Sequence, residues 1–185
     1  MKLDLLFAFE LGIIIQFVLL IFVIWSIIVP RKRIWPPPKT LSWQYLIYWG
    51  LFYIGVVIDI YTMVIDWNTW IIPFELRFYI GLPLSIIGGA FSLWGIMVLG
   101  IKNTTGLKNG FVVKMPYLIT RNPQYLGDIV MITGLILLAN SLYTTVLLLL
   151  TIIIFCIMPL PEEIWLEEKY GKEYLEYKYK TSRFL

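Results

Sequence analysis

The sequence predicts an all-α integral membrane protein of about five transmembrane helices, on the strength of its composition, its long uncharged stretches and the placement of its basic residues. Of the 185 residues, 59% are hydrophobic and 15% are charged, and the mean hydropathy is +0.81. A soluble domain is about 45–50% apolar and about 25% charged. One hydrophobic core in water does not require such an excess of apolar residues, whereas a lipid environment does.

Four apolar stretches define the expected transmembrane helices. The first three cover residues 11–29, 41–65 and 78–101. Each is long enough for one crossing, because a bilayer core needs about 20 helical residues, and Asp59 is the single charge within them. The fourth stretch, residues 129–161, is too long for one span and contains Asn140-Ser141. We therefore expect it to fold as a tight helical hairpin, which gives five spans.

Basic residues support this number of spans. With five spans, 13 of the 15 Lys and Arg residues fall on one side, in the segments 30–40 and 102–121 and in the tail after Pro161. Only Lys2 and Arg77 fall on the other side. Because Lys and Arg gather on the cytoplasmic side of membrane proteins, we expect the N-terminus outside and the C-terminus in the cytoplasm. The cell membrane is the simplest location.

We expect one membrane domain with two parts. Residues 1–101 form three transmembrane helices with short loops, and residues 102–185 form a polar loop, the helical hairpin and an amphipathic cytoplasmic helix. The helix carries an apolar stripe at spacings of three or four, made of Trp165, Leu166, Tyr170, Tyr174 and Tyr177. This stripe is expected to lie on the membrane or on the cytoplasmic helix ends. The chain has no histidine and a single cysteine, so no metal site of the usual Cys/His kind is expected.

Two polar motifs could carry chemistry, and each also has a purely structural explanation. The segment Arg121-Asn-Pro-Gln-Tyr125 follows a basic, glycine-bearing loop, and Asn122 and Pro123 suit the N-cap and first turn of a helix. The pair Glu162-Glu163 follows the last span, where acids favour a helix start or could hold a cationic group. Asp59 and Asp128 lie at or near membrane depth, where acids by default suggest function.

Taken together, these motifs match a known pattern. An Arg-(His/Asn)-Pro-x-Tyr segment opens a helical hairpin, and Glu-Glu, Leu, (Phe/Tyr)-Gly-x-x-Tyr-x-x-Tyr and Arg-Phe follow it. Here the pattern falls on Arg121-Asn-Pro-Gln-Tyr125, Glu162-Glu163, Leu166, Tyr170-Gly171, Tyr174, Tyr177 and Arg183-Phe184. The chain resembles the isoprenylcysteine carboxyl methyltransferase family and its relatives, the membrane phospholipid methyltransferases. The match covers about residues 105–185.

The resemblance implies an S-adenosylmethionine-dependent methyltransferase embedded in the lipid bilayer. Its substrate would be lipid-like or prenylated, methylated at a carboxylate oxygen or at an amine, with no role for nucleic acid. Carried over by position, the cofactor contacts fall on Asn109, Gly110, Phe111, Val112, Tyr117, Asn122, Pro123, Gln124, Tyr125, Glu162 and Glu163. The resemblance places the catalytic roles on Arg121, Tyr125 and Glu162.

Two positions depart from the family pattern. Asn122 replaces the family histidine, and Met158 replaces an arginine placed to meet the substrate. Methyl transfer from a sulfonium is an in-line displacement that needs positioning more than acid–base chemistry. An amine acceptor must first lose a proton to a nearby carboxylate, such as that of Glu163 or Asp128. Two alternatives stay open. One is a non-catalytic membrane protein that retains the fold, which Met158 favours, and the other is an NADPH enzyme similar to sterol reductases.

Overall fold

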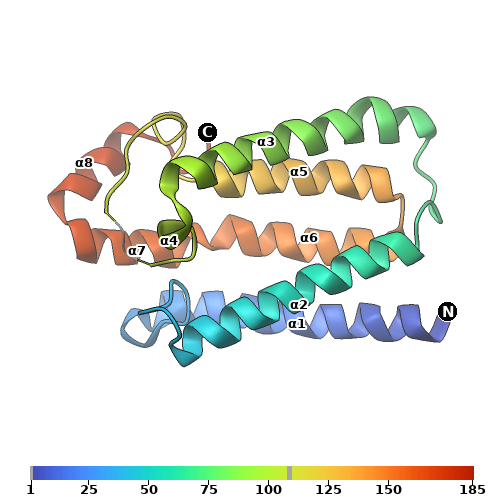
Figure 1. The fold of residues 1–185 in the computed structure, drawn as a ribbon, viewed down its shortest axis with the longest axis horizontal. Coiled ribbons are helices and arrows are strands. Elements are labelled where there is room, and N and C mark those ends of the chain that lie inside the picture. The colour runs from blue at the N-terminus through green and yellow to red at the C-terminus, as the bar shows by residue number, and fades with distance from the viewer. Residues whose placement is uncertain (1, 108–109) are drawn as a thin grey trace.

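The computed structural model describes residues 2–107 and 110–185, and in those ranges it is helical with no strand. The long helices are α1 (Lys2–Ile28), α2 (Trp43–Ile65), α3 (Leu82–Leu99), α5 (Pro123–Ala139) and α6 (Leu142–Ile157). The short elements are η1 (Pro30–Lys32), η2 (Leu76–Gly81), α4 (Ile101–Thr104), α7 (Pro159–Tyr170) and α8 (Lys172–Lys180). Figure 1 shows the long helices running along one axis, with α7, α8 and the connection from α4 to α5 gathered at one end.

The chain is an integral membrane protein, as predicted. In the described part of the chain, four helical stretches are long and apolar enough to cross a membrane: Leu3–Ile28, Trp43–Ile65, Leu76–Leu99 and Leu142–Tyr170. The fifth apolar helix, α5, has 17 residues, which is about 26 Å of helix and the short end of the spanning range. The predicted all-α membrane fold is confirmed.

The helical hairpin forms where it was predicted. Asn140 ends α5 in the left-handed region, at φ 48° and ψ 49°, a conformation that Asn tolerates better than most residues. Ser141 is the N-cap of α6, and its hydroxyl accepts a hydrogen bond from the Thr144 backbone nitrogen at 3.1 Å. The Asn140 side chain also accepts from the Ile72 backbone nitrogen at 2.8 Å, which ties the turn to the segment before α3.

The closest helix pair is α3 with α5, because small residues face each other along it. A Cβ added to Gly88 of α3 would lie 2.3 Å from the Met131 backbone nitrogen of α5. A Cβ added to Gly127 of α5 would lie 2.4 Å from the Ser92 backbone nitrogen of α3. No side chain fits at such distances, so both positions require glycine. This contact fixes the position of α5 along the axis of α3. Small residues allow such close packing in membrane helix pairs.

The remaining long helices pack around α6, which contacts α1, α2 and α5. The buried apolar core lies mainly between α1, α2, α5 and α6, and it includes Leu147 of α6, which is fully buried. α2 packs against α1 and α6, and cavities lie between its remaining side and α5. The bundle therefore combines one tight pair, α3 with α5, and one looser edge between α2 and α5.

Candidate functional site

A cavity of about 90 Å³ lies where α7 and α8 cover the connection between α4 and α5. A smaller cavity of about 40 Å³ shares Tyr117, Asn122 and Glu162 with it and reaches Gln124 and Tyr125. The loop before the helical hairpin and the acidic pair behind it, 40 residues apart in sequence from Asn122 to Glu162, therefore border the same space.

Glu162 is held by two donors that come from distant parts of the chain. The Trp35 indole Nε1 donates to Glu162 Oε1 at 2.7 Å, and the Tyr125 hydroxyl donates to the same oxygen. Oε2 accepts no hydrogen bond from the described residues. Trp35 is itself fixed, because it is 2% exposed and its ring stacks on Tyr48 at a centroid distance of 4.7 Å. The result is a carboxylate of fixed position with one oxygen available to a ligand.

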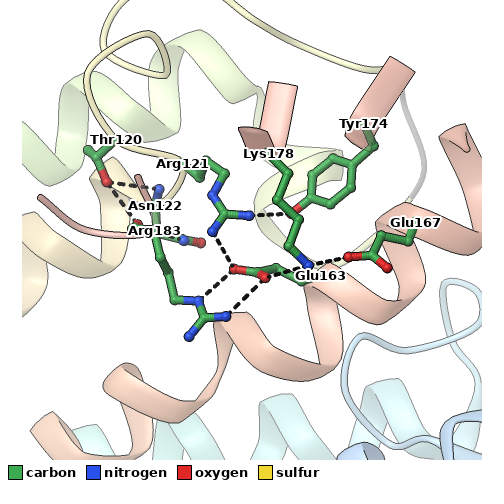
Figure 2. Close-up of polar contacts among 8 residues, drawn as sticks. All are labelled: Thr120, Arg121, Asn122, Glu163, Glu167, Tyr174, Lys178 and Arg183. Atoms are coloured by element: carbon green, nitrogen blue, oxygen red, sulfur yellow. Dashed lines mark hydrogen bonds and ion pairs between the residues drawn. The ribbon is translucent and has the colours of Figure 1, made fainter. Parts of the chain in front are cut away.

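Glu163, the next residue, has its charge satisfied by the protein itself (Figure 2). Arg183 donates to it from Nε at 2.7 Å and from Nη2 at 3.1 Å. Arg121 Nη2 lies 3.3 Å and Lys178 Nζ lies 3.4 Å from the same carboxylate. The hydrogen bond to Glu163 raises the pKa of Arg183. Three cations thus surround one buried carboxylate, and this group holds the C-terminal segment against the site.

The C-terminal segment is also tied to the start of α5 through the backbone of residues 182 and 183. The Arg121 backbone nitrogen donates to the Ser182 carbonyl oxygen at 2.9 Å. The Thr120 hydroxyl and the Asn122 side-chain nitrogen each donate to the Arg183 carbonyl oxygen at 2.9 Å. Asn122 stands at the N-cap position of α5, but its side chain makes no capping hydrogen bond. The predicted helix start at Asn122 and Pro123 is confirmed, and the Asn122 side chain binds the C-terminal segment instead of capping the helix.

The apolar stripe of the C-terminal helices lies on the helix ends, one of its two predicted positions. All five of its residues line the larger cavity. Phe111 packs against this wall, with ring centroids 5.1 Å from Tyr170 and 5.5 Å from Tyr177. The Tyr177 hydroxyl donates to the Tyr117 carbonyl oxygen at 2.6 Å, and burial raises the pKa of Tyr177, so it remains a neutral donor. The wall is aromatic and rigidly attached.

Most of the predicted site residues border these two cavities. The larger one is lined by Gly110, Phe111, Val112, Tyr117, Arg121, Asn122, Glu162 and Glu163, and the smaller one adds Gln124 and Tyr125. Asn109 lies outside the described residues. Pro123 borders neither cavity and is buried beside Gly95 of α3, 3.4 Å from the position of a Cβ there. Pro123 therefore shapes the helix start and does not face the space.

Sequence reasoning missed several residues of the site. Trp35 belongs to a proline-rich connector, and no spacing links it to Glu162. Thr104 of α4 lines the smaller cavity, and its hydroxyl is buried with no partner in the described part of the chain. The same is true of Arg121 Nε in the wall of the larger cavity. Buried polar atoms are normally paired, so the protein's own contacts leave the hydrogen-bonding capacity of these two donors unused.

A groove leads away from Glu162 between α2 and α5, and we call it the α2–α5 groove. It consists of a cavity of about 340 Å³ that begins at Trp35 and Tyr125 and a second of about 290 Å³ that reaches Asp59. The two cavities share Phe52, Asp128 and Phe155. Met158, at the position where the resemblance expects an arginine, lies in its wall and accepts a hydrogen bond from the Tyr48 hydroxyl at 3.3 Å.

The chain is thus a membrane-spanning helical bundle with a cavity of polar and aromatic residues at one end and a groove along its spans. The sequence profile of the phospholipid methyltransferase family matches residues 76–173, which is more than half of the chain and includes both Asn122 and Glu162. The chain belongs to that family. Neither the curated proteins nor the solved structures contain a significant match to it.

Proposed function

We propose that this membrane methyltransferase uses S-adenosylmethionine and transfers its methyl group to a lipid-like substrate that approaches from the bilayer. One observation carries the proposal: Asn122, which precedes the helical hairpin in the sequence, and Glu162, which follows it, line one cavity with an aromatic wall. The α2–α5 groove adds a second approach to Tyr125 from between the helices. Two separate approaches suit a water-soluble cofactor and a lipid that must meet at one point.

The residues around the cavity fit this cofactor. Oε2 of Glu162 can accept a charge-assisted hydrogen bond from the ammonium group of the cofactor. The aromatic wall offers ring faces to the adenine and to a positive charge. Arg121 Nε and the Thr104 hydroxyl are donors without partners among the described residues. Sites for molecules of this size occupy about 300–1,000 Å³, so we expect the walls of the 90 Å³ cavity to move apart on binding.

The chain contributes positioning and a dry environment to the reaction. When bound, the cofactor supplies a methyl group on a positively charged sulfur, which a nucleophile attacks in line. Glu162 orients the bound molecule, and Trp35 and Tyr125 hold Glu162 in place. The aromatic wall excludes water, which strengthens these electrostatic contacts. Alignment of this kind can contribute about 7–11 kcal/mol to lowering a barrier.

We further propose the arrangement in the membrane that the basic residues predict, with the Glu162 end of the bundle in the cytoplasm of the cell. Residues 102–185 would supply most of the cofactor contacts, and residues 1–101 would supply Trp35 and the α2 side of the groove. A non-catalytic relative that keeps the fold is the second candidate. It is favoured by Met158, which is 4% exposed and offers no charge to a substrate.

Calorimetry on the purified protein in detergent with S-adenosylhomocysteine tests the proposal. We expect binding, and we expect Glu162→Gln to weaken it by about tenfold or more, because a hydrogen bond to a charged group is worth about 1.5–3 kcal/mol. Glu168→Gln is the matched control, since Glu168 lies on the same helix but is exposed. A folded protein that binds no S-adenosylhomocysteine would reject the proposal in favour of the non-catalytic candidate.

A further inference from the structure

The α2–α5 groove has the dimensions and the apolar lining of a lipid site. Its two cavities, of about 340 Å³ and 290 Å³, adjoin at Phe52, Asp128 and Phe155. One end meets Tyr125, which binds Glu162 of the cofactor cavity, and the other reaches Asp59. A hydrocarbon chain laid in the groove would place its polar end at Tyr125 and its tail between the spans.

The charges in the groove point to a cationic head group. The described residues that line it include two carboxylates, Asp59 and Asp128, and no lysine or arginine. A substrate carboxylate would be repelled by these acids. Met158 stands where the resemblance expects an arginine, so that position offers no cation to bind a carboxylate. A substrate ammonium would meet opposite charge in an environment of low dielectric, where such attraction is strongest.

The two carboxylates differ in how far the protein satisfies them. Gln16 donates to both oxygens of Asp59, at 3.1 Å and 3.3 Å, and its own amide oxygen accepts from Thr151 at 3.1 Å. This closed cluster joins α1, α2 and α6. Asp128 receives one hydrogen bond, from the Ser92 hydroxyl to Oδ1 at 2.6 Å. Its Oδ2 accepts none from the described residues, so Asp128 is the carboxylate with capacity for a ligand.

Asp128 lies close to the end of the groove that adjoins the cofactor cavity. Asp128 follows Tyr125 by three residues on α5, so both side chains lie on the same helix face, one turn apart. Both also line the cavity of about 340 Å³ that begins beside Glu162. A group bound by Asp128 would therefore lie in the groove, one helical turn from Tyr125, which also lines the smaller cavity beside Glu162.

We propose that Asp128, oriented by Ser92, binds the ammonium group of an amine-bearing lipid in the α2–α5 groove and so selects an amine as the methyl acceptor. This inference rests on the proposed function. The ammonium transfers one proton to Asp128, which becomes a neutral acid, and the freed nitrogen lone pair attacks the methyl carbon. A nitrogen–carbon bond forms as the carbon–sulfur bond breaks, and its electron pair stays on sulfur, which becomes neutral. The nitrogen is then a methylammonium, and Asp128 later releases its proton to water.

Binding of simple long-chain probes tests the site without any turnover. Hexadecylamine, hexadecanol and palmitate share a chain length and differ in head group. We expect native mass spectrometry or calorimetry on the full chain in detergent to show hexadecylamine bound at least about tenfold more tightly than hexadecanol, with palmitate weakest. Asp128→Asn should remove the preference for the amine, because it keeps the shape and the Ser92 contact but removes the charge.

Asp59→Asn is the matched control, since it makes the same change in the same groove at a carboxylate that Gln16 already satisfies. It should keep the amine preference, and thermal unfolding should show that both variants are folded. Palmitate binding as tightly as the amine, or an amine preference that survives Asp128→Asn, would overturn the inference. Calorimetry with S-adenosylhomocysteine separates the two proposals: cofactor binding without amine preference overturns only this one, whereas amine preference without cofactor binding overturns the proposed function and leaves Asp128 as an amine-binding residue without a role in methyl transfer.

Discussion

The two faces of α5 are built in opposite ways. The face toward α3 is packed so closely that Gly88 and Gly127 leave no room for a single added carbon. The face toward α2 borders the α2–α5 groove, which has room for a small ligand beside Asp128. One helix therefore combines a rigid contact with an open one. The rigid contact fixes the positions of Tyr125 and Asp128, and the groove gives a ligand access to them.

The largest expected effect comes from breaking the tight face at Gly88. In Gly88→Ala the new Cβ would meet the Met131 backbone nitrogen at 2.3 Å, and backbone cannot move aside as a side-chain end can. Overpacking of this kind costs about 1–3 kcal/mol or more. We expect a clear loss of stability in thermal or denaturant unfolding of the purified protein in detergent.

Gly89→Ala is the control for that substitution at the adjacent residue. Its Cβ would meet only the flexible Met131 side chain, at 3.3 Å from the sulfur, so we expect a change below about 0.5 kcal/mol. Equal losses in the two variants would show that α3 and α5 are not held together by the glycine contact. The contrast between the two faces of α5 would then lose its physical basis.

The sequence predicts the spans and the helical hairpin well, because a lipid environment demands long apolar helices and Asn140-Ser141 is a pair suited to a turn within a run of 33 uncharged residues. It does not predict which helices pair. Gly88 signals a close approach, but the pattern does not name the partner, and α5 could be recognised as that partner only in three dimensions. Apolar periodicity likewise could not decide whether the C-terminal stripe covers lipid or protein.

The site was predicted where local motifs carry it and missed where distant segments complete it. Glu162 and Tyr125 belong to motifs, and both were expected at the site. Trp35 donates to Glu162 across 127 residues of sequence, and nothing in its local sequence indicates that contact. Asn122 stands at the N-cap position that its residue type predicts, yet its side chain binds the Arg183 carbonyl oxygen. Local propensity predicts the helix start here, whereas the contact with the C-terminal segment is tertiary and has no local signal.

A smaller effect is expected from Ser92, which joins the two faces of α5 by orienting Asp128. Ser92→Ala removes one hydrogen bond, worth about 1 kcal/mol in net terms, and frees the carboxylate to rotate. We expect hexadecylamine binding to weaken by about threefold to tenfold with a similar, small loss of stability. Calorimetry and thermal unfolding measure the two quantities.

Ser85→Ala is the control for that change, because Ser85 also lies on α3 and its hydroxyl also reaches α5, at 3.4 Å from the Met131 carbonyl oxygen, while it donates to the Gly81 carbonyl oxygen at 3.0 Å and binds no carboxylate. It should lower stability by no more than Ser92→Ala and leave amine binding unchanged. If both variants weakened hexadecylamine binding equally, the effect would come from the α3–α5 contact as a whole and not from the orientation of Asp128.

The smallest effect on stability is expected from filling the open face. Val56 of α2 lines the groove, whereas Val57 is 65% exposed and lines neither of the two groove cavities. Val56→Trp should occupy space that is empty in the folded protein, so stability should change by less than about 0.5 kcal/mol, while hexadecylamine binding falls at least about tenfold. Val57→Trp adds the same ring on the outward side and should change neither quantity. A groove that serves only as loose packing would gain stability from the larger side chain and bind the amine no less tightly, which is the opposite result.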